Sequence, residues 1–333
     1  MLSVDELATP CLLIDAEILD RNVAAMAAVL PGARLRPHVK AHKCTALAAV
    51  QYAAGHTTFT CSTPREVVGM ARAGLGDDLL LANETVDPGR LEAMAELGAP
   101  VTIAIDSGAT LEAAAQAGIS RCLIDVNVGL PRCGVKPESA GALADRARAR
   151  GIDVRGVMGY EGHLMMVSGR AERQAAVANS MALLRRAHAD VGGEIISAGG
   201  TGTYDMHADT GVNEVQAGSY TLMDTHYGSL GMPFEQALHV LGTVISVCAD
   251  WAVADVGLKA LGMDHGNPSI VGGDVWFCSD EHVTFAPTHA VSVGDRVRVI
   301  PAHIDPTMAM HEAAWITSRG EIVDRWPIDL RGW

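Results

Sequence analysis

Short apolar runs alternate with longer alanine-rich runs over the first two thirds of the chain. The alanine-rich runs, such as C-T-A-L-A-A-V-Q-Y-A-A and T-L-E-A-A-A-Q-A, contain good helix formers and often begin at Ser, Thr, Asp or Pro. The apolar runs predict strands at residues 35–40, 57–61, 78–82, 101–106, 122–128, 154–160, 195–198 and 219–223. Such an α/β alternation is typical of a (β/α)8 TIM-type barrel. The alternative is an open doubly wound sheet, which is less favoured because the chain has no dinucleotide-binding fingerprint.

The pattern changes after about residue 233, where strand-like runs such as V-L-G-T-V-I-S-V-C and D-R-V-R-V-I-P follow one another. Turn signals such as M-D-H-G-N-P and S-V-G-D separate these runs, with no convincing helix between them. We therefore predict an antiparallel β domain, to which the N-terminal run at residues 11–15 adds a strand. The expected domains are a barrel at residues 16–233 and a β domain built from residues 1–15 and 234–333.

Composition and charge narrow the class of protein. The 333 residues carry a net charge of −14, which argues against nucleic-acid binding as the main role. No apolar run approaches the ~18 residues of a membrane span, and the N-terminal M-L-S-V-D-E-L is acidic where a signal peptide is basic. The seven cysteines lack a C-x-x-C pair, which indicates reduced thiols and neither disulfides nor a zinc cage. We expect a cytoplasmic enzyme.

The stretch R-L-R-P-H-V-K-A-H-K, residues 34–43, is the densest basic cluster in the chain. Strand alternation places Arg36, His38 and Lys40 on one face and apolar residues on the other. The apolar face of a barrel strand packs on helices, so the polar face points inward and Lys40 lies at the strand's carboxyl end. Desolvation and nearby positive charge would favour a neutral amine there, which suits a Schiff base. Alternatively, Lys40 is a member of a buried ion pair; Lys43 falls at the start of the next helix.

A glycine-rich run, I-I-S-A-G-G-T-G-T-Y, follows the seventh predicted strand, and a shorter Q-A-G-S-Y run lies at the eighth. Backbone amides in such runs close on an anion, and barrels often bind phosphate with the loops after strands seven and eight. The alternative is a turn that needs glycine for backbone reasons alone. Together with a Schiff-base lysine, the two runs indicate a site for pyridoxal 5′-phosphate (PLP). The residues expected to hold its phosphate are Gly200, Thr201, Gly202, Thr203, Gly218 and Ser219.

The run V-I-P-A-H-I-D-P contains a candidate metal pair, His303 and Asp305. Pro301 and Pro306 predict an extended segment and not a helix, so the two side chains share one side of the chain. Imidazole nitrogen and carboxylate oxygen suit a divalent cation of intermediate hardness: Mn²⁺, with Mg²⁺, Co²⁺ or Zn²⁺ as other options. Two protein ligands leave positions for substrate oxygen, as in catalytic sites. The alternative is a hydrogen-bonded pair without a metal.

With these features placed, the sequence resembles the D-threonine aldolase and D-serine dehydratase family of PLP enzymes. This family has fold type III, the alanine-racemase-type fold of a barrel plus a β domain. The matching motifs are T-P-C-L-L-I-D, R-P-H-V-K-A-H-K, N-V-G-L-P-R-C-G-V, G-Y-E-G-H, A-G-G-T-G-T-Y, E-V-Q-A-G-S-Y and H-I-D. The resemblance implies that Lys40 carries PLP, that Arg132 lies near its phenolic oxygen and that Tyr160 lies near its pyridine nitrogen. We also expect His38 to contact the cofactor.

The resemblance implies one of two lyase reactions on a D-β-hydroxy-amino acid. Family aldolases pair histidine with aspartate and cleave D-3-hydroxy-α-amino acids such as D-threonine to glycine and an aldehyde. Family dehydratases, which act on D-serine or D-3-hydroxyaspartate, typically pair histidine with cysteine and release ammonia and a 2-oxo acid. Asp305 favours the aldolase, with His163 as the candidate general base. His163 follows Tyr160 by only three residues, a spacing closer to that of the dehydratases.

Two other classes of protein remain alternatives. A non-catalytic PLP carrier with a single barrel would need neither the β domain nor the metal pair. An amino-acid racemase would need a second base facing Lys40, typically a tyrosine from the β domain, and no tyrosine follows Tyr227. The resemblance also implies a homodimer with the active site near the interface, and a small-molecule substrate with neither nucleic acid nor membrane as a partner.

Overall fold

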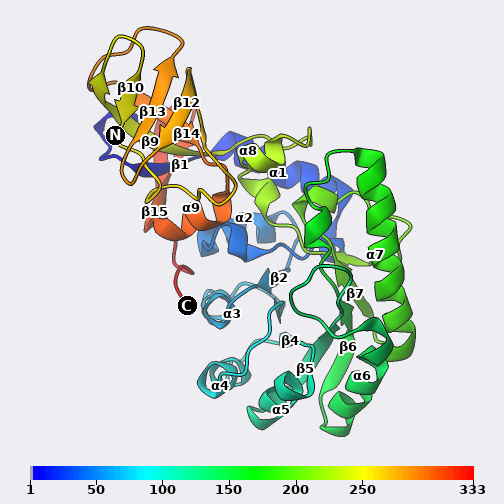
Figure 1. The fold of residues 1–333 in the computed structure, drawn as a ribbon. Coiled ribbons are helices and arrows are strands. Elements are labelled where there is room, and N and C mark those ends of the chain that lie inside the picture. The colour runs from blue at the N-terminus through cyan, green and yellow to red at the C-terminus, as the bar shows by residue number, and fades with distance from the viewer. Residues whose placement is uncertain (1–2) are drawn as a thin grey trace. The chain divides into compact units, whose positions relative to one another are not determined.

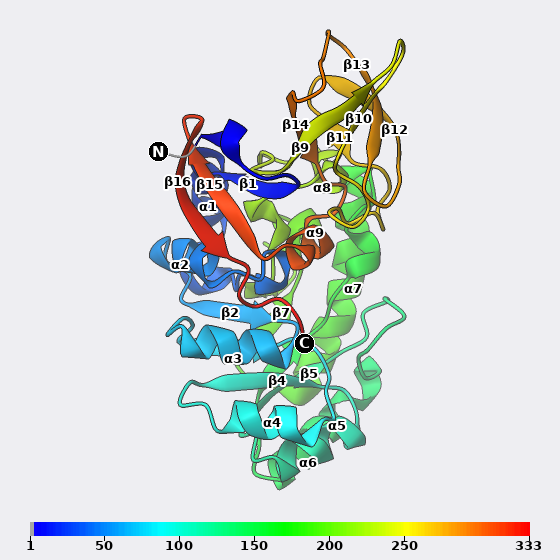
Figure 2. The same ribbon diagram turned by 90° about the vertical axis from the view of Figure 1, so that its left-hand side faces the viewer.

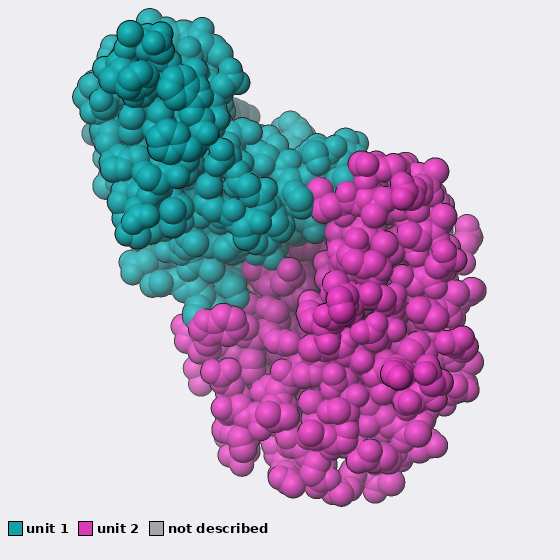
Figure 3. Space-filling view, viewed as in Figure 1, with its two compact units in different colours: residues 1–25, 41–47, 219–332 teal, residues 26–40, 48–218, 333 magenta. Residues whose placement is uncertain are grey.

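Two compact units make up the chain in the computed structural model, which describes residues 3–333. The antiparallel unit contains residues up to 25, 41–47 and 219–332, and the parallel unit contains residues 26–40, 48–218 and 333 (Figure 3). Each unit has its own sheet, which gives the unit its name. Helices α1 (Ala16–Val29) and α2 (Thr45–Ala53) contribute residues to both units.

The parallel unit is built from seven strands that neighbour one another in chain order. The strands are β2 (Thr58–Cys61), β3 (Asp78–Leu81), β4 (Val101–Ile105), β5 (Arg121–Asp125), β6 (Asp153–Met158), β7 (Ile195–Ala198) and β8 (Glu214–Val215). Figure 1 shows helices outside these strands: α3 (Pro64–Arg72), α4 (Pro88–Ala95), α5 (Gly108–Gln116), α6 (Ala140–Ala149) and α7 (Arg170–Val191). The strands predicted between residues 57 and 198 are confirmed to within three residues at each end.

Residues 35–38 close this sheet into a barrel. The segment bridges β8 at Leu35 and β2 at His38, in parallel in both cases. The backbone N–H groups of Arg36 and His38 donate to carbonyl oxygens in and just after β8, over 2.9 and 3.0 Å. The (β/α)8 barrel is therefore confirmed, and the open doubly wound sheet is excluded.

The first predicted strand is shorter than expected. It ends at His38, and Lys40 lies in the 3₁₀ turn η3 (Val39–Ala41) that follows. Pro37 has no N–H group to continue the ladder, which limits the segment to isolated bridges. Its carbonyl oxygen still accepts a hydrogen bond from the Thr60 N–H over 2.9 Å. Lys40 consequently stands just beyond the carboxyl end of the segment.

The prediction of an eighth strand at residues 219–223 is wrong. Its place is taken by β8, a few residues earlier, and Ser219–Thr221 forms the 3₁₀ turn η7. Met223 has a φ of 52°, a left-handed conformation that a strand does not contain. The whole run is buried without belonging to a sheet, so its apolar character reflects burial and not strand pairing.

Charged side chains fill the amino-terminal end of the barrel. Arg36 donates to the backbone carbonyl of Asp78 over 2.8 Å and to its carboxylate over 3.2 Å, and its Nε lies 2.8 Å from Glu214. Arg155 of β6 contacts the same Asp78 carboxylate, so non-adjacent strands meet inside the barrel. Two carboxylates balance the charge of Arg36, which therefore adds little of the positive charge that we expected beside Lys40. A layer of apolar side chains comes next along the strands: Leu80, Ala104, Leu123, Met158 and Ile195.

The antiparallel unit has a nine-stranded sheet in the order β10-β13-β12-β11-β14-β9-β1-β15-β16 (Figure 2). A second pairing of β9, with β10, closes six of the strands into a small barrel. The N-terminal β1 pairs with β9 and β15, so the predicted contribution of residues 11–15 is confirmed. The strands are β1 (Cys11–Asp15), β9 (Leu238–Val247), β10 (Ala252–Ala254), β11 (Ser269–Ile270), β12 (Gly273–Cys278), β13 (Val283–Pro287), β14 (Arg296–Ile300), β15 (Ala313–Ser318) and β16 (Glu321–Pro327).

The antiparallel unit also contains the short helices α8 (Thr225–Gly228) and α9 (Ile304–Met310). Helix α9 contradicts the extended segment predicted around residues 301–306. Pro306 is the third residue of α9, within the first turn, where the missing N–H would have had no helical partner. His303 keeps an extended backbone as the N-cap residue, with a φ of −144°. The remaining short turns are η1 (Val4–Glu6), η2 (Gly32–Arg34), η4 (Pro137–Ser139), η5 (Gly162–Leu164) and η6 (Thr201–Thr203).

None of the helices within residues 3–333 is long and apolar enough to cross a membrane. None of the seven cysteines, all of which lie in this described part, forms a disulfide there. Burial raises the pKa of Cys122 to about 12 and that of Cys44 to about 11, so these thiols are protonated core residues at neutral pH.

Replacing Arg36 by alanine should lower the free energy of unfolding by about 3–5 kcal/mol, because Glu214 loses its guanidinium partner inside the barrel and Asp78 keeps only Arg155. Urea denaturation followed by circular dichroism measures this loss. Arg150 pairs with Glu112 at the surface of the same unit, so Arg150→Ala is the matched control and should have a far smaller effect. Equal effects of the two substitutions would contradict a role for Arg36 in holding the barrel together.

Candidate cofactor and metal sites

The carboxyl ends of the barrel strands carry most of the predicted cofactor residues. These residues follow the strands in order: Lys40 after residues 35–38, Arg132 after β5, Tyr160 and His163 after β6, residues 200–203 after β7 and Gly218 after β8, with Ser219 next in the chain. Parallel strands present their carboxyl ends at one end of a barrel, so the residues up to Gly218 share one end of the parallel unit. Barrel enzymes build their active sites at this end.

Lys40 is half-buried in the turn that follows the closing segment. Its backbone nitrogen lies 3.5 Å from Nδ1 of His38, which places these two predicted cofactor residues against each other. Val39 and Ala41, on either side of the lysine, are fully buried. The turn is therefore anchored by its neighbours and presents Lys40 from a fixed backbone.

Arg132 and Tyr160, two of the predicted cofactor residues, contact each other. Cζ of Arg132 lies 5.3 Å from the centroid of the Tyr160 ring, a cation–π contact. Asn127 shapes the loop that carries the arginine. Its amide donates to the carbonyl of Leu130 over 2.8 Å, and its side-chain oxygen accepts from the Gly129 N–H over 3.0 Å.

His163 is exposed and packs on the same loop from η5. A Cβ at Gly129 would lie 2.9 Å from Nε2 of His163, and the φ of Gly129 is 128°, so glycine is required there. The structure thus brings the candidate base His163 to the loop that carries Arg132.

Glu161, which the sequence did not reveal, ties the Tyr160 segment to the glycine-rich loop. It is fully buried; its Oε1 accepts from the Thr203 hydroxyl over 2.7 Å, and its Oε2 accepts from the Gly199 N–H over 3.2 Å. Nε2 of His207 lies 3.4 Å from the same Oε1. The one signal in the sequence was a single carboxylate inside the otherwise weakly polar run G-Y-E-G-H-L-M-M.

Burial alone would raise the pKa of Glu161. The hydrogen bonds and charge of His207, together with the hydrogen bond from Thr203, outweigh burial and hold the pKa below its ordinary value of 4.5. Glu161 is therefore ionised at neutral pH. Because the folded-state pKa is the lower one, the ionised group stabilises the fold above about pH 4.5, and this stabilisation is lost as the pH falls through the folded-state pKa.

The glycines of the loop are needed for close packing. A Cβ at Gly202 would lie 2.4 Å from the carbonyl oxygen of Met165, and one at Gly200 would lie 3.1 Å from the Met165 sulfur. The hydroxyl proton of Thr203 goes to Glu161, so this side chain supports the loop. The glycines therefore have a backbone role in addition to any contact with phosphate.

A cluster of acidic side chains, which was not predicted, lies at the carboxyl ends of β3 to β5. One potential ligand atom each of Glu84, Asp106 and Cys133 falls within 4.8 Å of the others. Asp106 accepts from the Gly134 N–H over 3.2 Å, which attaches the loop after β5 to the end of β4. Burial, followed by the charge and hydrogen bond of Glu84, holds the pKa of Asp125 well above its ordinary value. Asp125 therefore favours its protonated form at the end of β5.

The metal pair lies at the start of α9 in the antiparallel unit. Nε2 of His303 lies 3.8 Å from Oδ1 of Asp305, and its Nδ1 lies 2.7 Å from Oδ2 of Asp264, which was not predicted. Asp224 fixes the backbone between the pair, because its Oδ2 accepts from the Ile304 N–H over 3.1 Å. An imidazole nitrogen that faces a carboxylate, with the other nitrogen held by a second carboxylate, is a donor set that fits a divalent cation.

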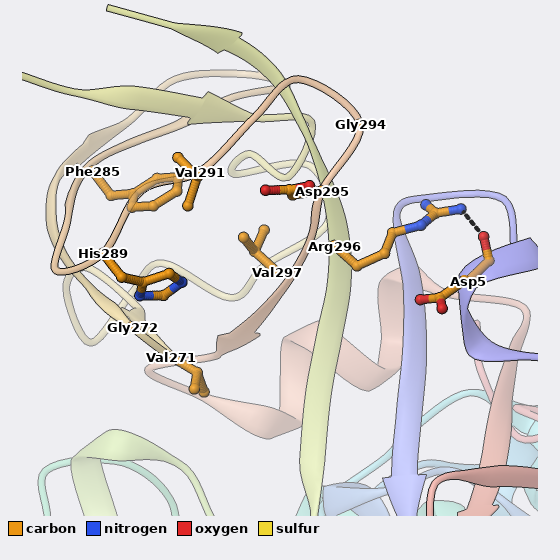
Figure 4. Close-up of a pocket in the computed structure, with 10 residues that line it drawn as sticks. All are labelled: Asp5, Val271, Gly272, Phe285, His289, Val291, Gly294, Asp295, Arg296 and Val297. Atoms are coloured by element: carbon orange, nitrogen blue, oxygen red, sulfur yellow. Dashed lines mark hydrogen bonds between the residues drawn. The ribbon is translucent and has the colours of Figure 1, made fainter. Parts of the chain in front are cut away.

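A cavity of about 540 Å³ in the antiparallel unit involves none of the predicted site residues. It is lined by Asp5, Val271, Gly272, Phe285, His289, Val291, Gly294, Asp295, Arg296 and Val297 (Figure 4). The Arg296 guanidinium donates to the carbonyls of Asp5 and Leu7 over 2.5 and 2.9 Å, and to the Thr243 hydroxyl over 2.5 Å. Arg296 thus fastens the N-terminal segment and does not mark a binding site.

Two domain families match the chain, and the boundary between them lies near residue 233, where the pattern of predicted elements changes. The alanine racemase N-terminal domain family matches residues 14–226, and the serine dehydratase domain family matches residues 237–317. A D-threonine aldolase from Arthrobacter sp. is 35% identical, with 97% of this chain and 93% of the relative covered. A 3-hydroxy-D-aspartate aldolase from Paracoccus denitrificans (strain Pd 1222) is 32% identical, with 98% and 93% covered.

Solved structures agree with these relatives over the whole chain. A D-threonine aldolase from Filomicrobium marinum superimposes with a TM-score of 0.93 at 31% identity, over 100% of this chain and 98% of that one. A D-threo-3-hydroxyaspartate dehydratase variant in its metal-free form gives 0.90 at 27% identity, over 100% of both chains. The protein is thus an enzyme with the alanine-racemase-type fold, and its relatives are lyases. It belongs to the D-threonine aldolase and D-serine dehydratase family of PLP-dependent enzymes.

Replacing Glu161 by glutamine should weaken PLP binding about tenfold or more, because the amide cannot accept from both the Gly199 N–H and the Thr203 hydroxyl. Titration of the PLP-free protein with PLP, followed by absorbance, measures this change. Glu172 lies exposed on α7, so Glu172→Gln is the matched control and should bind PLP like the wild type. Wild-type affinity in the Glu161 variant would show that the loop keeps its shape without this carboxylate.

Proposed function

We propose that this chain is a PLP- and divalent-metal-dependent aldolase that cleaves D-3-hydroxy-α-amino acids such as D-threonine to glycine and an aldehyde. The observation that carries the proposal is the carboxylate of Asp305, whose Oδ1 faces Nε2 of His303 over 3.8 Å. A carboxylate suits the harder cation of an aldolase, whereas the family dehydratases typically use cysteine here. The two aldolases are 35% and 32% identical to this chain, against 28% for a D-threo-3-hydroxyaspartate dehydratase from Delftia sp. (strain HT23).

The barrel residues are proposed to hold PLP. Lys40, beside His38, binds the aldehyde of PLP. Arg132 binds its phenolic oxygen, and Tyr160 lies at its ring nitrogen. The phosphate is bound by residues 200–203 with Gly218 and Ser219. Bound PLP supplies an electron sink for the bond that breaks at the substrate's α-carbon. A phenol stabilises less positive charge on the ring nitrogen than a carboxylate would. Tyr160 therefore makes help at the β-hydroxyl more important.

We assign a divalent cation to His303 and Asp305, with Mn²⁺ as the preferred ion and Mg²⁺, Co²⁺ or Zn²⁺ as other options. The metal-free form of the related dehydratase supports metal use in the family. A cation at this pair supplies Lewis acidity for the substrate's β-oxygen. His303 would bind the cation through one nitrogen and Asp305 through one oxygen, which leaves other coordination positions open.

His163 is proposed to take the proton of the β-hydroxyl as the Cα–Cβ bond breaks. It is exposed at the carboxyl end of the barrel, next to the loop that carries Arg132. Cleavage of D-threonine in this way gives acetaldehyde and leaves an electron pair on the α-carbon. Glycine forms when that carbon receives a proton, which we assign to Lys40.

Dehydration of the same class of substrate is the second candidate function. The spacing of His163, three residues after Tyr160, favours it. In this reaction Lys40 would remove the α-proton, the β-hydroxyl would leave as water, and hydrolysis would give a 2-oxo acid and ammonia. The two reactions therefore differ in whether the α-proton or the hydroxyl proton is removed first.

We further propose a homodimer. Trp251 and Trp276 pack with ring centroids 5.9 Å apart, and both are exposed on the antiparallel unit together with Phe277. A second copy of the chain would remove this apolar surface from water. The seven scattered cysteines, which include no C-x-x-C pair, support the cytoplasmic location expected for the chain.

Purified protein supplied with PLP, Mn²⁺ and D-threonine should release glycine and acetaldehyde in equal amounts, and L-threonine should not be cleaved. Amino-acid analysis and an ammonia assay measure the products. Asp305→Ala should lose activity by about 10²-fold or more while it keeps bound PLP, because it lacks the carboxylate ligand. Asp329→Ala, which removes an exposed carboxylate that accepts from Thr45 in the same unit, is the matched control and should keep the activity.

Other products would select other classes of enzyme. Ammonia and a 2-oxo acid in place of glycine would contradict the aldolase and select the dehydratase. Formation of L-allo-threonine, which differs from D-threonine only at the α-carbon, would indicate a racemase, and no turnover of any D-β-hydroxy-amino acid would favour a PLP carrier.

A further inference from the structure

The imidazole rings of His226, His265 and His303 form a stack that includes the histidine of the metal pair. The sequence did not predict that these three residues lie together. The His265 ring lies on the His303 ring, with centroids 4.0 Å apart and planes 12° apart. The His226 ring packs on His265 at 4.1 Å and 34°. The three residues come from α8, from the loop between β10 and β11, and from the N-cap of α9. The stack therefore joins three segments that lie far apart in the sequence.

Asp264 contacts the same His303 ring at its edge. Oδ2 of Asp264 lies 2.7 Å from Nδ1 of His303, so the imidazole donates its Nδ1–H to the carboxylate. A neutral imidazole has one proton, and Nε2 then keeps its lone pair. Nε2 is the nitrogen that faces Asp305 over 3.8 Å. Asp264 thus selects the tautomer that a cation at this pair requires.

His265 offers a third nitrogen nearby, because one ligand atom each of Asp264, His265 and His303 falls within 4.8 Å of the others. A cation, however, lies in the plane of the imidazole that binds it, along the nitrogen lone pair. The planes of His265 and His303 are nearly parallel at a centroid distance of 4.0 Å, so one cation cannot lie in both. His265 therefore acts as a packing surface for the His303 ring and not as a ligand of the same ion.

Backbone contacts hold this loop against the start of α9. The Gly262 N–H donates to the Thr307 hydroxyl over 2.8 Å, and that hydroxyl donates to the His303 carbonyl over 2.7 Å. A Cβ at Gly262 would lie 2.3 Å from Cγ of Pro306, so glycine lets the loop approach the helix. Asp264, two residues later, is delivered to the edge of His303 by this contact.

We propose that Asp264 and His265 are positioning residues for the metal ligand His303, in which Asp264 fixes the tautomer and His265 fixes the plane of the ring. The inference rests on the cation assigned to His303 and Asp305 in the proposed function. It adds that affinity for the cation depends on two residues that do not bind it. The Asp264 side chain is 56% exposed, so its removal leaves no buried cavity.

Mn²⁺ binding to the PLP-loaded protein tests the inference, with free Mn²⁺ measured by electron paramagnetic resonance after bound metal has been removed by a chelator. Asp264→Ala should weaken Mn²⁺ binding by about 10- to 100-fold, the usual effect of losing such a carboxylate partner. His265→Ala should weaken it several-fold. His265→Phe keeps a flat ring without a nitrogen and should bind like the wild type. Asp274→Ala, which removes an exposed aspartate from β12, is the matched control and should change nothing.

Wild-type affinity in Asp264→Ala would overturn the proposal for Asp264. A loss in His265→Phe as large as that in His303→Ala would overturn the proposal for His265, because it would make this residue a ligand. His303→Ala and Asp305→Ala separate this test from that of the proposed function. Both should abolish Mn²⁺ binding, and if neither does so, the assignment of the cation itself is wrong.

Discussion

The backbone hydrogen bonds that seat residues 35–38 between β8 and β2 are the constraint on which the parallel unit depends. They close a row of parallel strands into a barrel and end the closing segment at His38, so that the following turn presents Lys40 at the carboxyl end. Closure also fixes the ends of β6 and β7, and hence the loops that follow them, relative to this lysine. Arg36 in the same segment pairs with Asp78 and Glu214 at the opposite end. One short segment therefore organises both ends of the barrel.

In each unit, carboxylates hold the groups to which we assign chemistry. Glu161 accepts two hydrogen bonds from the glycine-rich loop, and Asp264 accepts one from the imidazole of His303. The Asp224 carboxylate accepts one from the Ile304 N–H, in the backbone between the proposed metal ligands His303 and Asp305. Charge-assisted hydrogen bonds of this kind are stronger than neutral ones and restrict the groups that they hold. The proposed reaction then needs little rearrangement of protein groups at the moment of chemistry.

Local patterns in the sequence predicted most of the barrel, because β2 to β7 alternate with helices, and α3, α4 and α5 begin at Thr, Asp and Ser caps. They failed at residues 219–223, since apolar content reports burial and not strand pairing, and at Pro306, since proline is tolerated in a first helical turn. Motifs also placed His303 next to Asp305. Periodicity carries no information on contacts between distant segments, so Asp264, 39 residues before His303, stayed hidden.

The lysine that we propose to carry PLP can be located directly. Borohydride reduction of the PLP-loaded protein fixes the cofactor to its lysine, and proteolysis followed by mass spectrometry identifies the labelled residue. Lys40 alone is expected to carry the label. A label on Lys43, in the same basic stretch, or on any other lysine would contradict the placement of the cofactor at the end of the closing segment.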